Sequence, residues 1–456
     1  MSQTALPLPD ERLPFHTKLI YGLGDWGNTT TSTIFLFFFA FFLTDIARLD
    51  PGYAAPVLLL GGIWDAVNDP IIGVLADRVR TRWGRRRPFF LFGALPLAVL
   101  FMFLWWVPPI TTQVGLAIYY TVVYLLFDTA YTAVSVPYSA LTPELTEDYD
   151  ERTHLSGYRM SVSMAGGLIA AVAVPILAGA FLEKKTGYLV MAVIFGLLAA
   201  VPYLMLFFTV KERHLTHQSN DLSILESFRH TFRNRPFRFA VVIYMFTWMT
   251  VNLIASMMQY FLTYWMHMAD QLEIVLGVVQ AAALVCIPLM VWLSGKAGKQ
   301  RAFVSGAVSL GVVMLGLAFL SPSQQPLAYV LAVCTGFGIA AAHVIPWSIM
   351  PDVIEMDELE TGQRREGTFY GFMVFLQKTG TAFTLALVQW VLHLTGYVPD
   401  AVQSPQVLTA IRVLFGVLPC VLLLPAIFFA WRFPINRAQH LELRRALAEK
   451  RSDRAA

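Results

Sequence analysis

The sequence predicts an all-α membrane protein with twelve transmembrane helices in two pseudo-symmetric six-helix bundles. Its 456 residues are 57% hydrophobic and only 14% charged, and the mean hydropathy of +0.59 is far above that of a soluble domain. Apolar stretches of about twenty residues, the length that crosses a bilayer as a helix, recur along the whole chain. These stretches are continuously apolar and do not alternate, which argues against a β-barrel.

The expected spans are residues 20–44, 53–76, 88–107, 113–138, 158–181, 188–209, 237–265, 272–293, 301–320, 326–349, 367–394 and 407–431. A polar central segment, residues 211–236, separates the first six spans (residues 1–210) from the last six (residues 237–435). A short amphipathic helix is expected within it, at 222–232, and the tail 436–456 is expected to be a short soluble helix. Two six-helix halves related by a repeat are typical of a large class of secondary transporters.

Lysine and arginine gather in loops on one side of the predicted bundle. The loop after the second span carries Arg78, Arg80, Arg82, Arg85, Arg86 and Arg87, and the central segment and the tail are also basic. Because cytoplasmic loops are enriched in positive charge, both termini are expected in the cytoplasm and the protein in the inner (plasma) membrane. The polar N-terminus does not resemble a cleavable signal peptide.

The remaining composition narrows the class of protein further. The formal net charge of +3 does not indicate a nucleic-acid partner, because the basic residues lie in short loops. The three cysteines lie in apolar segments without the spacing of a disulfide framework or a metal site, so we expect them to be packing residues. No cofactor other than a coupling ion is expected, and nothing requires more than a monomer.

Two acids four residues apart, Asp65 and Asp69, interrupt the second span, with Asn68 between them and Pro70 after them. The spacing puts both carboxylates on one helix face, and Pro70 leaves the carbonyl of Ala66 without its helical donor. Unpaired acids at bilayer depth are rare and face a cavity or a partner, and such oxygens suit small hard cations. We therefore expect a cation site here; buried structural ion pairs are the alternative.

The fourth span carries Asp128, Thr132, Ser135 and Ser139 on one helix face. This span and the second run in the same direction, so Thr132 and Asp69 are expected at similar depths. Asp128 is an acid inside an apolar span, which favours a functional role for it. Hydroxyls that bond their own helix backbone are the alternative for the serines and the threonine.

Lys378 is a lone cation in the long apolar eleventh span, at a depth similar to that of Asp69. It is expected to pair with a span-two acid when the ion is absent or to hold an anionic or hydroxyl-rich substrate; a structural ion pair is the alternative. Further polar groups stand among aromatics, an arrangement that suits a sugar or amphiphile pocket. These further candidates are Asp25, Asn28 and Thr29 in span one, Asn252, Gln259 and Tyr260 in span seven, and His343 and Trp347 in span ten. Helix packing is the alternative for each of them.

The run from Gly73 to Arg78, followed by 84–87 (Gly-Arg-Arg-Arg), matches the loop motif of the major facilitator superfamily, and 295–301 holds a degenerate echo of it. Charged stretches at 143–159 and 352–366 fall at equivalent places in the two halves. We expect salt bridges there that lock the cytoplasmic face, with solvated loop charge as the alternative. The gating candidates are Asp77, Arg78, Arg85, Asp352, Glu355, Arg364 and Glu366.

Across nearly its whole length the chain resembles the glycoside–pentoside–hexuronide:cation symporters, the melibiose-permease-like family of that superfamily. The resemblance rests on residues 21–24, 64–70 (Trp-Asp-Ala-Val-Asn-Asp-Pro), 136–141, 158–159, 362–366, 378 and 396–399. It implies that the family's cation site maps onto Asp65, Asn68, Asp69 and Thr132, its helix-eleven lysine onto Lys378, and its helix-five arginine onto Arg159.

The resemblance also implies a departure in the substrate site. The two acids that bind galactoside in melibiose permease fall at Thr29 and Ser135, with Asn28 in place of a lysine and Ser139 in place of a tryptophan. Asp25 and Asp128 are acids that lie near, but not at, the positions of the two missing acids, and they would compensate for them in part. The substrate is therefore expected not to be melibiose, and other glycosides, uronides and amphiphiles stay open, because the animal sodium-coupled lysophospholipid symporters resemble this family too.

The leading hypothesis is a secondary active symporter, not an enzyme, in which Na⁺ or H⁺ bound at Asp65 and Asp69 drives uptake of a sugar, glycoside or uronide by alternating access. The alternatives are a sodium-coupled lysophospholipid transporter and an uncoupled facilitator. A remote alternative is an intramembrane aspartyl protease, because 22–25 (Gly-Leu-Gly-Asp) matches the Gly-x-Gly-Asp signature and Asp128 would be its second acid.

Overall fold

The computed structural model describes residues 13–146, 149–210, 231–361, 365–435 and 439. Within them, twelve helices are long and apolar enough to cross a membrane, which confirms the predicted fold class. The predicted amphipathic helix at 222–232, apart from a helical turn at 231–233, and the predicted tail helix lie outside the described residues.

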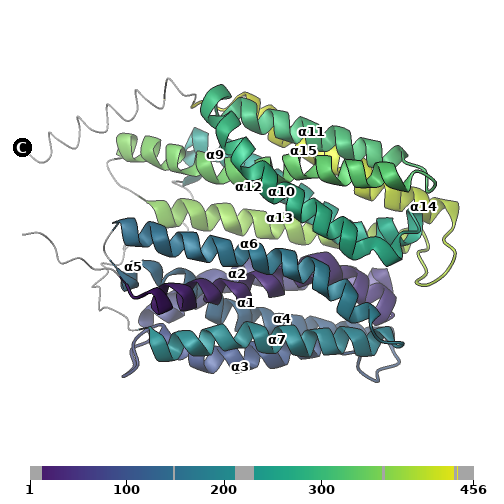
Figure 1. The fold of residues 1–456 in the computed structure, drawn as a ribbon, viewed down its shortest axis with the longest axis horizontal. Helices are drawn as coiled ribbons and strands as arrows, with labels where there is room; N and C mark the ends of the chain where they lie inside the picture. The colour runs from purple at the N-terminus through teal and green to yellow at the C-terminus, as the bar shows by residue number, and fades with distance from the viewer. Residues whose placement is uncertain (1–12, 147–148, 211–230, 362–364, 436–438, 440–456) are drawn as a thin grey trace, which may run out of the picture.

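Two groups of helices run roughly parallel to one another (Figure 1). The N-terminal group comprises α1 (Phe15–Phe41) with its extension η1 (Phe42–Ile46), α2 (Pro51–Arg78), α3 (Arg87–Leu104), α4 (Gln113–Ser139), the short α5 (Thr142–Leu145), α6 (Tyr149–Gly179) and α7 (Lys184–Thr209). The C-terminal group comprises α9 (Arg235–Tyr260) with η2 (Phe261–Trp265), η3 (Ala269–Gln271), α10 (Leu272–Ala297), α11 (Lys299–Phe319), α12 (Gln325–Thr361), α13 (Glu366–Leu394), and α14 (Pro405–Arg412), η4 (Val413–Val417) and α15 (Leu418–Trp431) in one line.

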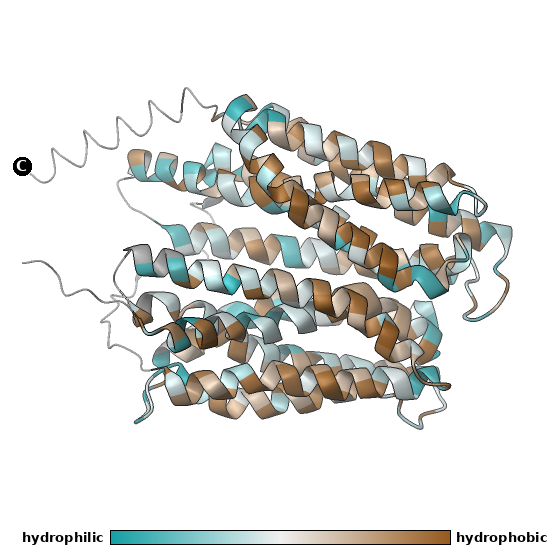
Figure 2. Cartoon of the chain, viewed as in Figure 1, coloured by the Kyte–Doolittle hydropathy of each residue, from teal (hydrophilic) through white to brown (hydrophobic). Residues whose placement is uncertain are grey.

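We call the end of the bundle where α1 begins and α15 ends the terminal end, and the opposite end the distal end (Figure 1). The halves touch through α2 and α13, α1 and α9, and α6 and α10. Brown, hydrophobic residues prevail along the helices, and teal, hydrophilic residues gather at both ends (Figure 2). This distribution is the one expected of a bundle with its sides in lipid.

Two helices extend well beyond the predicted spans. The prediction placed the fifth span from residue 158 and ended the tenth at 349, whereas α6 begins at Tyr149 and α12 continues to Thr361. Both extensions cover the charged stretches, which are therefore largely helical. Hydropathy marks where a helix leaves the bilayer, whereas the helix itself continues into water as long as its residues favour it.

Matching backbone features recur in the two halves. The loops after α2 and α10 contain Gly84 (φ 109°) and Gly298 (φ 88°), positions that favour glycine. At the distal end, α1 and α9 both pass into π-helical turns, η1 and η2, which are followed by Arg48 (φ 63°) and His267 (φ 53°). The turns carry the same Phe-Leu-Thr sequence, at 42–44 and 261–263. These pairs support the predicted internal repeat.

A close contact between halves positions the site described below. A Cβ added to Gly62 of α2 would lie 2.5 Å from the Cβ of Ala382 on α13. The two small residues let the helix backbones approach closely, as small residues do in membrane bundles. Lys378, one turn before Ala382, is thereby brought within reach of the acids that follow Gly62.

Candidate functional site

A cluster of charged side chains lies where α2, α4 and α13 meet. The Lys378 ammonium is 2.6 Å from Asp65 Oδ1 and 2.6 Å from Asp69 Oδ2. The side chains of Asp65, Asp69 and Lys378 keep 24%, 28% and 21% of their surface exposed. The cluster is therefore internally paired but not fully enclosed by protein.

The other predicted members of the cation site join this cluster in two different ways. The Thr132 hydroxyl donates to Asp69 Oδ1 at 3.2 Å. The Asn68 amide donates instead to Asp128 Oδ2 at 3.2 Å, and both residues are buried. Asp128 also interacts with Asp65. Asp128, predicted as a substrate residue, thus lies with the residues predicted to bind the cation. We call this set the acidic cluster (Asp65, Asn68, Asp69, Asp128, Thr132 and Lys378).

The acidic cluster has more acidic than basic groups. Asp65, Asp69 and Asp128 are three carboxyl groups, and Lys378 is their one ammonium partner among the described residues. Uncompensated charge is costly at bilayer depth. A metal ion or protons would supply the missing positive charge, and the oxygens of Thr132 and the carboxylates are suitable hard ligands for such an ion. No metal-ligating group of three His, Cys, Asp or Glu side chains stands out among the described residues.

A second charged cluster lies in the N-terminal half, where α1, α4 and α6 meet. Arg159 Nε is 3.3 Å from Asp25 Oδ1, and the guanidinium lies over the Tyr138 ring, 4.9 Å from its centroid. Ser139 lies 3.5 Å from Arg159, and Thr29 exchanges a 2.6 Å hydrogen bond with Ser163. We call Asp25, Tyr138, Ser139 and Arg159 the arginine cluster.

Asn28 and Ser135, two further substrate candidates, lack a comparable set of hydrogen-bond partners among the described residues. The buried Asn28 Oδ1 has no hydrogen-bond partner among the described residues, and Ser135 is half-buried on α4. A buried unpaired acceptor needs a water or ligand donor, so Asn28 is consistent with a polar ligand.

Aromatic rings from α9, α12 and α13 gather in the C-terminal half. Trp347, 41% exposed, stacks on Tyr370 with ring centroids 5.9 Å apart and meets Tyr244 edge-on at 5.4 Å. His343 packs against Trp248 at 5.1 Å, with Nδ1 2.9 Å from the Ile339 carbonyl. We call Tyr244, Trp248, His343, Trp347 and Tyr370 the aromatic shelf; an exposed indole face of this kind suits a sugar ring or an apolar chain.

The predicted gating residues that the structure describes lie at the terminal end. Asp352 pairs with Lys299 at 2.7 Å, a contact within the C-terminal half. Beside the predicted set, Arg365 forms a 2.8 Å pair with Asp357, also within that half. Arg78 and Glu366 are exposed, and Arg85 and Glu355 are half-buried. Arg364 and the side chain of Asp77 lie outside the described residues, so the predicted lock stays a prediction.

Contacts between the two halves that the sequence did not reveal lie at the distal end. Asp45 of η1 accepts hydrogen bonds from Tyr264 of η2 and from Tyr397, which follows α13. Tyr260 and Gln259, expected in the substrate pocket, lie here as well: Tyr260 bonds Thr44 at 2.7 Å and Gln259 donates to Tyr188 at 3.4 Å. The repeated Phe-Leu-Thr sequence was the signal available for these residues.

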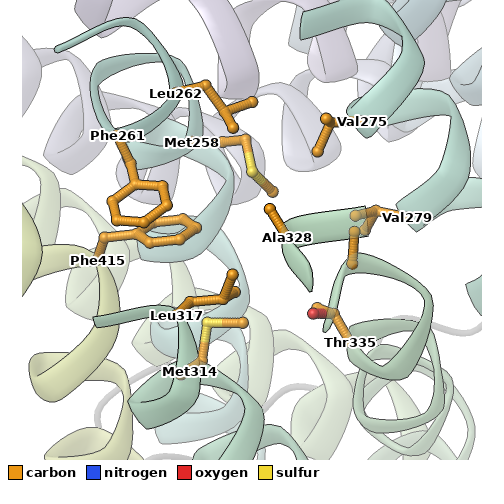
Figure 3. A pocket seen from close by; sticks show the side chains of 11 residues that line it. Met258, Phe261, Leu262, Val275, Val279, Met314, Leu317, Ala328, Thr335 and Phe415 are labelled. Carbon is orange, nitrogen blue, oxygen red and sulfur yellow. The ribbon is translucent and has the colours of Figure 1, made fainter. Parts of the chain in front are cut away.

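A small apolar cavity lies inside the C-terminal half, between α9, η2, α10, α11, α12 and η4 (Figure 3). Stacked Phe261 and Phe415, with centroids 4.3 Å apart, form one wall, and Thr335 supplies the hydroxyl in a lining of otherwise carbon and sulfur atoms. Such a lining offers little to a polar ligand.

Twelve membrane-spanning helices in two repeated halves, with charge held between them, define a multi-pass secondary transporter of the major facilitator superfamily. The chain belongs to the family described as MFS/sugar transport protein, whose profile matches residues 20–437. It is 34% identical to an uncharacterized symporter of Synechocystis sp., over 99% of each chain. It is also 28% identical to sodium-dependent lysophosphatidylcholine symporter 1-B of Danio rerio, over 98% of this chain and 94% of the relative.

A putative glycoside/cation symporter of Escherichia coli, YagG, is 30% identical over 90% of each chain. Among solved structures, the D-xylose-proton symporter superposes with a TM-score of 0.65 at 17% identity, over 92% of this chain and 97% of that one. The nucleoside transporter NupG superposes with a TM-score of 0.64 at 14% identity, over 92% of this chain and 100% of that one. At these identities the structures show the shared fold alone.

Proposed function

We propose that this protein is a cation-coupled symporter whose coupling ion, Na⁺ or H⁺, binds in the acidic cluster. The observation that carries the proposal is the Lys378 ammonium, which lies 2.6 Å from both Asp65 and Asp69 in a setting with three carboxyl groups. The ammonium occupies the position that a cation would take. Relatives named as cation-coupled symporters support the same interpretation.

In this proposal, the ion and Lys378 compete for the same carboxylates. An ion that binds Asp65, Asp69 and the Thr132 hydroxyl releases Lys378 from α2. Because α2 and α13 belong to different halves, this exchange alters a contact between the halves. Binding of the ion thereby biases the equilibrium between states of the transporter, and linkage requires the substrate to change ion affinity by the same factor.

We propose a sugar, glycoside or uronide as the substrate, held between the arginine cluster and the aromatic shelf. Arg159, Asp25 and Asn28 offer hydrogen bonds to hydroxyl or carboxylate groups, and Trp347 offers a face for a sugar ring. Once the ion has released it, the Lys378 ammonium is available to a uronide carboxylate. Ser135, Ser139, Thr29 and His343 complete the candidate set.

An amphiphile is a second candidate substrate. The observation in its favour is the likeness to lysophosphatidylcholine symporters of fish, chicken and frog along 94–98% of this chain. An apolar chain would lie on the aromatic shelf, and the arginine cluster would receive a phosphate. A competition experiment separates the two candidates. Excess simple sugar would inhibit uptake of a glycoside or uronide but not uptake of an amphiphile.

We propose that the terminal end faces the cytoplasm of the cell and that the chain works as a monomer in the inner membrane. The basic loops support this orientation, because Arg78 to Arg87 and Lys296 to Arg301 all lie at the terminal end. We also propose that residues 211–236 divide the chain into its two halves. The same proposal includes a lock at the terminal end to which Asp352 and Glu366 belong.

The test is uptake into proteoliposomes under imposed Na⁺ or H⁺ gradients, with a panel of labelled glycosides, uronides and lysophospholipids. We expect uptake of one class to require a cation gradient and to disappear in Asp69→Asn, while the variant still inserts and elutes as a single species. Gradient-driven uptake by Asp69→Asn at the wild-type rate would overturn the proposal.

A further inference from the structure

The two halves meet at the distal end through a buried carboxylate. Asp45 is 3% exposed and lies in η1, at the end of the first membrane-spanning helix. Its carboxylate accepts from the Thr44 hydroxyl at 2.6 Å, from Tyr397 at 2.7 Å and from Tyr264. The two tyrosines belong to the opposite half, so Asp45 is a point at which the halves are tied together.

The partners of Asp45 that we observe are hydroxyl groups and not a cation. Burial raises the pKa of Tyr397 well above its ordinary value, so this hydroxyl stays protonated and able to donate. Tyr188, Tyr260 and Asp400 lie near the carboxylate as well. A buried carboxylate is tolerated only while hydrogen bonds replace its hydration, and breaking a buried set of this kind costs more than breaking an exposed pair.

The internal repeat explains the position of the contact. Aligning the shared Phe-Leu-Thr sequences of η1 and η2 places Asp45 opposite Tyr264. The residues that follow the repeated threonines in the two halves are therefore the residues that bind each other. Both lie in π-helical turns, which are uncommon and occur often at functional sites.

Further contacts extend the same interface. Thr44 bonds Tyr260 at 2.7 Å, and Gln389 donates to Tyr260 at 3.2 Å. Toward the surface, Arg48 and Lys184 contact Asp400, and His393 lies 2.7 Å from Asp50. These outer pairs are about half exposed and contribute little.

We propose that Asp45 is the latch of a gate at the distal end, and that release of its hydrogen bonds to Tyr264 and Tyr397 is the step that opens the transport pathway on that side. This inference goes beyond the proposed cation and substrate sites, because none of the latch residues belongs to them. When the halves part, water replaces the tyrosine hydroxyls around the carboxylate. The carboxylate of Asp45 is therefore hydrogen-bonded in both states, by tyrosine hydroxyls when the gate is closed and by water when it is open. At an intermediate separation neither the tyrosines nor water can supply these hydrogen bonds, which makes the gate bistable.

The experiment measures the distance between the halves at the distal end. Spin labels are attached at Thr111→Cys, in the loop before α4, and at Ser323→Cys, in the loop before α12, after Cys286, Cys334 and Cys420 are replaced by alanine. Double electron–electron resonance in detergent and in nanodiscs then gives the distance distribution. We expect a short distance to prevail in the latched protein and a longer distance to prevail in Tyr264→Phe/Tyr397→Phe, which leaves Asp45 buried with Thr44 alone.

Two further variants keep the test decisive. Asp45→Asn, which keeps the size of the side chain and weakens its acceptor capacity, is expected to shift the distribution in the same direction. Asp400→Asn removes the exposed pairs with Arg48 and Lys184 and is expected to leave the distribution of the latched protein unchanged. Elution as a single species shows that each variant is folded. Unchanged distributions in both latch variants, or an equal shift in Asp400→Asn, would overturn the proposal.

Discussion

The ammonium of Lys378 lies 2.6 Å from the carboxylate of Asp69, so an ion pair joins α13 of one half to α2 of the other. The same ammonium contacts Asp65. The pair lies within two membrane-spanning helices, where a lone charge of either sign is costly. Any cation that enters this cluster therefore changes both its charge balance and a contact between the halves.

Replacement of Asp69 by asparagine removes one carboxylate and its contacts with Lys378 and Thr132. We expect Asp69→Asn to lower cation-dependent uptake by about two orders of magnitude or more, because a direct ligand of the coupling ion is lost. Asp270→Asn, at an exposed position of η3, is the matched control and is expected to leave uptake unchanged. Equal uptake by both variants would contradict the assignment.

Replacement of Lys378 by methionine removes the competing ammonium. We expect Lys378→Met to bind Na⁺ about tenfold more tightly, because the ion no longer displaces an internal partner from Asp65 and Asp69. Isothermal titration of Na⁺ into purified protein measures the affinity. An affinity equal to or weaker than that of the wild type would show that the lysine and the ion do not compete.

Substitution of Gly62 by alanine tests the close approach of α2 and α13. The added Cβ would lie 2.5 Å from that of Ala382, and overpacking of this kind costs about 1–3 kcal/mol of stability. We expect a lower Tm and weaker cation response in Gly62→Ala, and recovery of both in Gly62→Ala/Ala382→Gly. Gly371→Ala, where an added Cβ meets open space, is the control. A double variant as impaired as the single one would refute the contact.

Arg159 allows the two clusters to be separated functionally. Arg159 contacts Asp25, Tyr138 and Ser139 but no member of the acidic cluster in the interactions observed among the described residues. We expect Arg159→Gln to abolish substrate uptake while cation-induced thermal stabilisation persists. Loss of both responses in a folded variant would mean that the arginine cluster is part of the cation site.

The fold and most of the acidic cluster could be predicted from the sequence. Continuous apolar runs indicated the spans, and Asp65, Asp69 and Lys378 stand out because charged residues are rare inside such runs. Their pairing across the halves depends on Gly62 and Ala382, and the sequence does not show which helices meet. The partner of Asn68 could not be predicted either, because Asp128 and Asp69 are at similar depths and only packing decides between them.

The distal gate could not be predicted for a different reason. Tyrosines are common in membrane-interface segments, so Tyr260, Tyr264 and Tyr397 do not stand out in the sequence. Only the structure shows that they lie beside Asp45. Asp45 itself lies at the edge of a predicted span, where an acid is not unusual. The terminal-end charges were the more conspicuous gating signal because they form dense runs.

The most direct test of the central claim is the Tm of the purified protein against Na⁺, Li⁺ and pH, measured on the wild type and on Asp65→Asn. The account predicts that a coupling cation raises the Tm of the wild type in a saturable manner, because a ligand that binds the folded state stabilises it, and that this rise disappears in Asp65→Asn. A response to pH without one to Na⁺ would identify the ion as a proton. A wild type that responds to neither, or a variant that responds as the wild type does, would contradict the assignment of the acidic cluster as the ion site.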